Sequence, residues 1–126
     1  MLLRTTTGGF TTCLCARLGS DGVLTLANAG QLSPYRNGSE VDLPPALPLG
    51  MVAESVYNDC QITVSKGETI TFLSDGVVEA RDTKGGLLGF DRTQELSTRP
   101  AREIAAIAQQ FGQEDDITVV TLTRMV

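Results

Sequence analysis

Two groups of carboxylates are placed where they could bind a metal ion. Asp75 follows an apolar, strand-like segment and precedes Gly76, and the pair Asp115-Asp116 comes directly before another such segment. A carboxylate at the end of a strand is held by a rigid element and exposed at its tip, which suits a ligand for a hard cation such as Mg²⁺ or Mn²⁺. If the two strand ends meet, Asp75 and Asp115 form one negatively charged pocket.

Each group also has an ordinary structural interpretation. Asp is a preferred N-cap residue, so Asp75 could cap a short helix that starts near Val77. Asp115 and Asp116 could form a solvated acidic turn, in which the repulsion between neighbouring carboxylates costs little. The spacing alone does not show that the two segments meet, so both interpretations stay open.

The composition excludes several other kinds of chemistry. The chain has 126 residues and no histidine, which excludes Ser-His-Asp and Cys-His catalysis and histidine-type zinc sites. Its formal net charge is −5, and its Lys and Arg residues are scattered, so nucleic acid is not an expected partner. No apolar run approaches the roughly 18 residues of a membrane span, so we expect no membrane insertion by this segment.

The three cysteines indicate a reducing compartment, because an odd number cannot all pair within one chain. We therefore expect a cytoplasmic protein. Cys13 and Cys15 are two residues apart in a strand-like stretch, so both should lie on the same face of that strand. We expect them to be two small, buried apolar groups.

The apolar pattern predicts strands, then helices, then a last strand. The predicted strands are Phe10–Leu18, Val23–Ala29, Gln61–Val64, Thr69–Leu73 and Ile117–Arg124. Turn residues at Gly19–Gly22 join the first two strands into a hairpin, and Asn37-Gly38 predicts another turn. The prolines in Val41–Ala53 predict an ordered loop in place of a central strand.

Short helical segments are expected at Val77–Ala80 and Asp91–Leu96, and a longer helix between Pro100 and Gly112. Apolar residues recur along the longer helix with the 3.6-residue period and predict its packing face. These are Ile104, Ile107, Ala108 and Phe111. The fold class is therefore α+β, a sheet with helices packed on one face, and residues 1–126 are expected to form a single domain.

Short motifs follow one another in the order found in one enzyme family. They are Gly9–Thr12 (GFTT), Ala27–Gly30 (ANAG), Leu47–Gly50 (LPLG), Ser74–Ala80 (SDGVVEA), Leu88–Arg92 (LGFDR) and Gly112–Val119 (GQEDDITV). With these motifs the chain resembles the metal-dependent protein phosphatase (PPM) superfamily, and more narrowly its stage II sporulation E branch. The motifs extend over nearly the whole chain.

The resemblance implies an antiparallel β-sandwich with flanking helices and a two-metal centre for Mn²⁺ or Mg²⁺ at one end of the sheets. Asp75 and Asp115 match the family's metal ligands, and Asp116 and Gly76 would support the site. The implied activity is hydrolysis of phosphoserine or phosphothreonine in signal transduction. The implied substrate is a phosphorylated regulatory protein of the anti-sigma-antagonist kind.

Two departures from the family pattern change this expectation. The family's first metal-binding element, an aspartate followed by glycines, has no counterpart before Gly9, so the domain is expected to be N-terminally incomplete. Two divalent cations carry about +4, whereas Asp75 and Asp115 supply about −2. We therefore expect at most one weakly bound cation and little or no activity from this chain alone. Gln31 stands where the family usually has His, and we assign it no catalytic role.

Two further expectations concern binding. The alternative to an enzyme fragment is a non-catalytic protein-binding module, a pseudophosphatase. Unpaired strand edges and uncovered apolar surface predict a homodimer or a higher oligomer. Arg92 is expected to be an exposed or salt-bridged residue, and Asn28 to satisfy backbone groups at a tight strand end.

Overall fold

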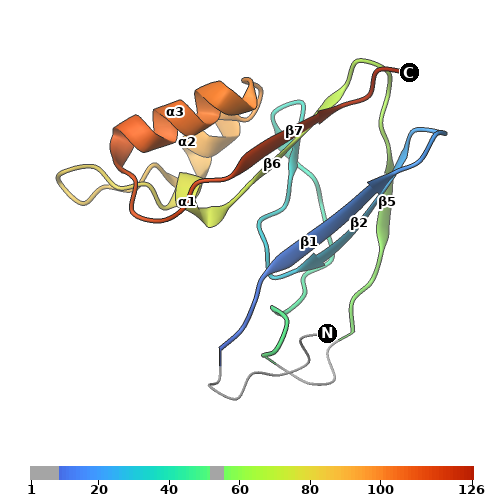
Figure 1. Cartoon of the computed structure of the whole chain (residues 1–126), viewed down its shortest axis with the longest axis horizontal. Coiled ribbons are helices and arrows are strands. Elements are labelled where there is room, and N and C mark those ends of the chain that lie inside the picture. Colours follow the sequence, from blue (N-terminus) through green and yellow to red (C-terminus); the bar gives the residue numbers. More distant parts are fainter. Residues whose placement is uncertain (1–8, 52–55) are drawn as a thin grey trace. The chain divides into compact units, whose positions relative to one another are not determined.

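A computed structural model describes residues 9–51 and 56–126, and the chain divides into two compact units. The first unit comprises Met1–Gln31 and Asp42–Ser65, and the second comprises Leu32–Val41 and Lys66–Val126. Each unit has its own antiparallel sheet (Figure 1). The expectation of a single domain stays a prediction.

The first unit contains a three-stranded sheet in the order β1-β2-β5, built from β1 (Cys13–Leu18), β2 (Val23–Ala29) and β5 (Cys60–Thr63). The predicted hairpin is confirmed, and β2 has the predicted bounds. β1 begins later than expected because Thr11 pairs with Leu49 of the proline-rich loop, through N–H···O bonds of 2.9 and 2.7 Å. That loop contains no strand in its described residues, 41–51, as predicted.

The prediction for the cysteines of β1 is half right. The Sγ atoms of Cys13 and Cys15 lie 3.7 Å apart, so the two side chains share one face. Their predicted burial is wrong, because Cys13 is half-buried and Cys15 is exposed. Leu24 and Leu26, which are fully buried, pair with Leu18 and Ala16 and therefore lie on the face of the sheet opposite the two cysteines. The smaller Ala29, which pairs with Cys13, is also buried.

The second unit contains a four-stranded sheet in the order β4-β3-β6-β7. Its strands are β3 (Tyr35–Arg36), β4 (Ser39–Glu40), β6 (Thr69–Leu73) and β7 (Val119–Thr123). β6 has the predicted bounds, and β7 is shorter than predicted. The predicted turn at Asn37-Gly38 is confirmed by positive φ angles of 52° and 79°, which are typical of a two-residue hairpin turn.

A charged pair connects the short hairpin to the start of β6. The Arg36 guanidinium donates to both carboxylate oxygens of Glu68, at 3.0 and 2.9 Å. Asn37 Nδ2 donates to the same carboxylate at 2.9 Å. Such a two-pronged contact constrains orientation more than a single bond does, so it holds the hairpin against β6.

Three helices accompany this sheet: α1 (Asp75–Val78), α2 (Gly89–Leu96) and α3 (Ala101–Gly112). The first two begin two residues earlier than predicted, and the third follows Pro100 as predicted. Gly112 ends α3 at a φ of +147°, where its Cα packs against the main-chain oxygen of Arg81. None of the helices in the described ranges is both long enough and apolar enough to span a bilayer.

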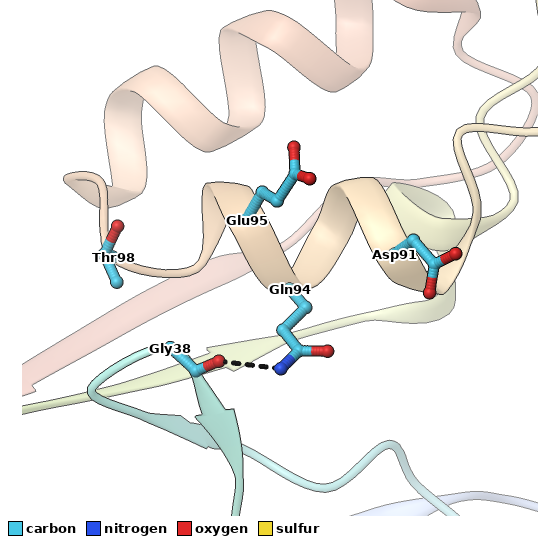
Figure 2. A pocket seen from close by; sticks show the side chains of 5 residues that line it. All are labelled: Gly38, Asp91, Gln94, Glu95 and Thr98. Atoms are coloured by element: carbon cyan, nitrogen blue, oxygen red, sulfur yellow. Dashed lines mark hydrogen bonds between the residues drawn. The ribbon is translucent and has the colours of Figure 1, made fainter.

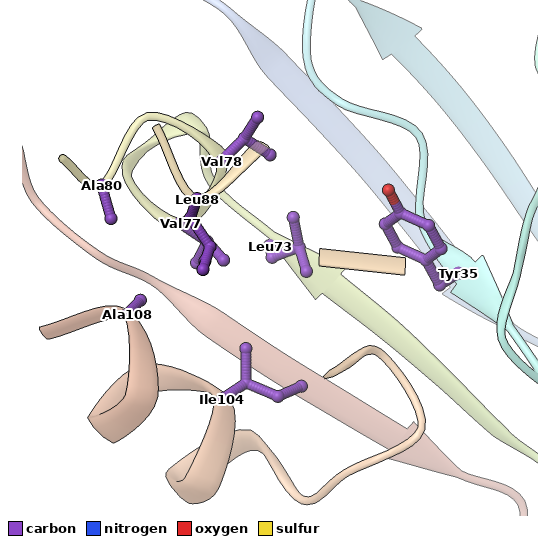
Figure 3. Packing of buried hydrophobic residues seen from close by; sticks show 8 residues of the cluster. All are labelled: Tyr35, Leu73, Val77, Val78, Ala80, Leu88, Ile104 and Ala108. Atoms are coloured by element: carbon purple, nitrogen blue, oxygen red, sulfur yellow. The ribbon is translucent and has the colours of Figure 1, made fainter. Parts of the chain in front are cut away.

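The core of this unit lies between the helices and the end of β6 (Figure 3). Its buried members are Tyr35, Leu73, Val77, Val78, Ala80, Leu88, Ile104 and Ala108. The predicted packing face of α3 is confirmed for Ile104 and Ala108, and Phe111 packs partly buried against the cluster. This packing fixes α1 at the end of β6, next to the candidate site.

Candidate metal centre

The register of β6 and β7 brings the two acidic segments to the same end of this strand pair, where β6 ends and β7 begins. The antiparallel ladder runs from Thr69↔Thr123 to Leu73↔Val119. Asp75 follows the last paired residue of β6, and Asp115-Asp116 precedes the first paired residue of β7. Because the end of one antiparallel strand lies beside the beginning of its neighbour, the two segments emerge together.

Ser74 joins these segments through hydrogen bonds of its backbone and its side chain. Its N–H donates to the Thr118 carbonyl at 2.9 Å, and its Oγ accepts the Thr118 N–H at 2.9 Å. The same hydroxyl donates to the Asp116 carbonyl at 3.3 Å. The junction of β6 and α1 is thus attached to the acidic turn at three points.

Gly76 packs directly on the turn. A Cβ atom at this position would collide with the main-chain oxygen of Asp116 and would lie 3.3 Å from Cγ1 of Ile117. Gly76 itself is buried. Only glycine lets the first turn of α1 approach the Asp116 backbone so closely.

The three carboxylates of the site are exposed. Asp75 is the first residue of α1, whereas Ser74 is the N-cap and makes no side-chain cap bond. The interpretation of Asp75 as an N-cap is therefore wrong. Asp115 Oδ1 accepts the N–H of Asp116 at 2.7 Å, which stiffens the turn. Asp115 and Asp116 form a solvent-exposed acidic turn, as their structural interpretation predicted. The same turn also contacts the segment that carries Asp75.

The donor set fits a hard divalent cation in its chemistry. Exposed carboxylate oxygens on two adjoining turns are what Mg²⁺ or Mn²⁺ prefers, with water filling the other positions. Within residues 9–51 and 56–126, no group of three or more His, Cys, Asp or Glu side chains could hold a metal. The assignment of Asp75 and Asp115 as ligands, with Asp116 and Gly76 in support, stays a prediction.

Other residues singled out in the sequence have structural partners. Arg92 is exposed, and its guanidinium lies 5.5 Å from the ring centroid of Phe111, a cation–π distance. The Asn28 side chain donates to the Gln31 carbonyl at 2.8 Å and accepts the Gln31 N–H at 2.9 Å. Asn28 therefore satisfies backbone groups at the strand end, as expected. Both of these backbone groups belong to Gln31.

The structure also contains an open surface hollow of about 510 Å³ beside α2 (Figure 2). Gly38, Asp91, Gln94, Glu95 and Thr98 line it. Gln94 Nε2 donates to the Gly38 carbonyl at 3.0 Å and closes one side. This hollow was not predicted from the sequence, in which the only mark of it is the spacing of Asp91 and Glu95 by one helical turn. The hydrogen bonds made by Ser74 were not predicted either.

The fold is similar to those of solved protein phosphatase domains. The RsbU and RsbW domains of Rv1364c from Mycobacterium tuberculosis match over 90% of this chain and 36% of their own, with 21% identity and a TM-score of 0.65. The phosphatase domain of the cell fate determinant SpoIIE from Bacillus subtilis, Mn presoaked, matches over 98% of this chain and 60% of its own, with 20% identity and a TM-score of 0.66. The SiaA-PP2C domain of Pseudomonas aeruginosa matches over 82% and 47%, with 20% identity and a TM-score of 0.60. The antiparallel sheets with their helices therefore form a PPM-type phosphatase fold, as the resemblance implied.

The sequence defines the family more narrowly. The profile of Stage II sporulation protein E (SpoIIE) matches residues 1–125, so the chain belongs to the SpoIIE family. No curated protein sequence is significantly similar to it. The chain spans between 36% and 60% of the length of the three solved chains named above.

Proposed function

We propose that this chain supplies part of the metal centre of a protein serine/threonine phosphatase. The observation that carries the proposal is the contact between the Ser74–Gly76 and Asp116–Thr118 segments, which places Asp75 and the Asp115-Asp116 turn at one edge of the sheet. Membership of the SpoIIE family and the PPM-type fold support the reaction class.

Each residue has a defined role in this proposal. Asp75 and Asp115 would hold Mn²⁺ or Mg²⁺ through their carboxylate oxygens. Gly76 and the Asp116 backbone set the spacing of the two turns through their close contact. When bound, the cations of such a centre activate water for attack on phosphorus and stabilise the developing charge.

The charge of the site limits what this chain does alone. Asp75 and Asp115 contribute about −2, against about +4 for a two-metal centre. The described residues contain no group of three or more metal-ligating side chains that would add to this pair. This charge allows at most one weakly bound cation, and the proposal requires that the chain alone binds that one, with slow or no hydrolysis of phosphoesters.

The proposed substrate is phosphoserine or phosphothreonine on a regulatory protein of the anti-sigma-antagonist kind, and family membership supports it. We further propose that the protein works in the cytoplasm. Free thiols support that location, since Cys13, Cys15 and Cys60 form no disulfide.

A calorimetric titration with MnCl₂, combined with phosphate release from a phosphoserine peptide, tests the proposal. The wild-type chain should bind about one Mn²⁺ weakly, Asp115→Asn should bind none, and Asp91→Asn, a matched exposed aspartate on α2, should bind as the wild type does. Unchanged binding in Asp115→Asn would refute the site. Rapid Mn²⁺-dependent phosphate release by the wild-type chain would refute the expectation of weak activity.

The alternative function is a non-catalytic binding module, which the small number of grouped ligands favours. Such a module would bind the phosphorylated regulatory protein equally well with Mn²⁺ or with EDTA. Binding that requires Mn²⁺ and fails in Asp115→Asn would exclude this alternative.

A further inference from the structure

The backbone oxygen of Ser74 bonds to α1, and the Thr118 N–H of the neighbouring segment bonds to the Ser74 side chain instead. In an antiparallel pair, hydrogen-bonded positions alternate with non-hydrogen-bonded ones, and at a hydrogen-bonded position the two opposed residues exchange two N–H···O bonds. Ser74 lies opposite Thr118, one position beyond the last paired residues, and its N–H donates to the Thr118 carbonyl at 2.9 Å. The return bond is not made, and the Ser74 carbonyl instead accepts the N–H of Val77 at 3.2 Å in the first turn of α1.

The Ser74 side chain takes the place of this carbonyl. Its Oγ accepts the Thr118 N–H at 2.9 Å, close to the length of a ladder bond. The chain can therefore turn from β6 into α1 at Ser74, while the pairing of the two segments continues by one more residue, to Thr118. The same hydroxyl donates its proton to the Asp116 carbonyl at 3.3 Å, so it contacts both sides of Ile117 in the turn.

We propose that Ser74 is a positioning residue for the metal centre, whose hydroxyl holds the Asp115-Asp116 turn at a set distance from Asp75. The consequence for metal binding rests on the proposed function, whereas the effect on the turn does not. Two exposed carboxylates on separate segments repel each other, and the hydroxyl keeps them together before a cation is bound. Preorganisation of this kind raises affinity by lowering the cost of ordering the ligands.

The test replaces the hydroxyl and measures both the turn and the site. Ser74→Ala removes the acceptor, and Ser74→Thr retains it. Ser97→Ala is the matched control, because the Ser97 hydroxyl in the same unit donates to the Gln94 carbonyl at 2.6 Å and takes no part in the hydrogen bonds that hold the acidic turn. Amide hydrogen exchange of Thr118 is followed by NMR in the metal-free protein, and Mn²⁺ affinity is measured by calorimetry.

We expect Ser74→Ala to speed exchange of the Thr118 amide about tenfold and to weaken Mn²⁺ binding by a similar factor, as the loss of one hydrogen bond predicts. Ser74→Thr should stay within about threefold of the wild type in both measurements. Ser97→Ala should change neither. The predicted pattern therefore separates the hydroxyl of Ser74 from a general loss of stability.

Each contrary result has a separate meaning. Unchanged Thr118 exchange in Ser74→Ala would overturn the role of the hydroxyl in the turn. Faster exchange with wild-type Mn²⁺ affinity would overturn the positioning role and leave the proposed function standing. Absence of Mn²⁺ binding in the wild type would overturn the proposed function and the metal-related role of Ser74 together. If Ser74→Ala does not fold, an unprotected Thr118 amide in the wild type or in Ser74→Thr overturns the proposal.

Discussion

The Cα of Gly76 packs against the main-chain oxygen of Asp116, and no side chain at position 76 would fit between them. This contact joins the first turn of α1 to the turn that carries Asp115. Both partners are backbone groups, so neither can move aside as a flexible side chain would. The spacing between Asp75 and the acidic turn therefore depends on the absence of a single methyl group.

Gly76→Ala should lower the free energy of unfolding by about 1–3 kcal/mol, the usual cost of overpacking, and should weaken Mn²⁺ binding. Urea denaturation and calorimetry measure the two effects. Gly19→Ala is the control: a Cβ there lies 2.7 Å from Asp21 Oδ1, the end of an exposed side chain, which can turn aside at the cost of one bond from the Val23 N–H. A Gly76→Ala protein as stable as Gly19→Ala, with wild-type Mn²⁺ affinity, would contradict this prediction.

Mn²⁺ should stabilise the folded chain in proportion to its binding. At a concentration one hundred times the dissociation constant, a ligand that binds only the native state adds about 2.7 kcal/mol. Melting temperature followed with increasing MnCl₂ should therefore rise for the wild type and for Asp91→Asn, and EDTA should reverse the rise. Asp75→Asn should not respond, and an equal rise in Asp75→Asn would show that the cation binds elsewhere.

Cys13 should become more reactive when Cys15 is removed. The pKa of the Cys13 thiol is raised by its hydrogen bond with Cys15, then by burial, then by the neighbouring thiolate charge. Cys15→Ala removes the first and third causes, so the Cys13 pKa falls and more thiolate is present at a fixed pH near 8. Alkylation by iodoacetamide, followed by mass spectrometry, should be faster at Cys13 and unchanged at Cys60. Equal or slower alkylation of Cys13 would contradict this prediction.

Self-association is expected through an exposed strand edge. β7 ends the sheet order β4-β3-β6-β7, so one side of this strand has no strand partner within the described residues. We propose that a second copy pairs there, and sedimentation should detect a dimer at micromolar concentration. Val120→Lys, which adds a charge at an exposed position of β7, should shift the equilibrium to monomer. A wild-type monomer at micromolar concentration would argue against this proposal.

Much of the fold could be predicted because its elements are encoded locally. β2 and β6 have the predicted bounds since short apolar runs flanked by turn residues define them. α3 follows Pro100 and ends at Gly112, both of which are local signals. The burial of Cys13 was wrongly predicted because period-two spacing shows that two residues share a face and does not show which face is covered.

The candidate site depended on contacts between distant residues. α1 starts at Asp75 because the Ser74 carbonyl closes its first turn, and β7 starts at Val119 because Thr118 bonds to a side chain in place of a strand backbone. Ser74 and Thr118 are 44 residues apart, and no local pattern reports their pairing. The acidic residues, Gly76 and the family motifs could be identified from the amino-acid sequence alone. Only the antiparallel register of β6 and β7 in the tertiary structure brings the two acidic segments together. Helix and turn preferences act between neighbouring residues, whereas hydrogen bonds between strands join residues that are far apart along the chain.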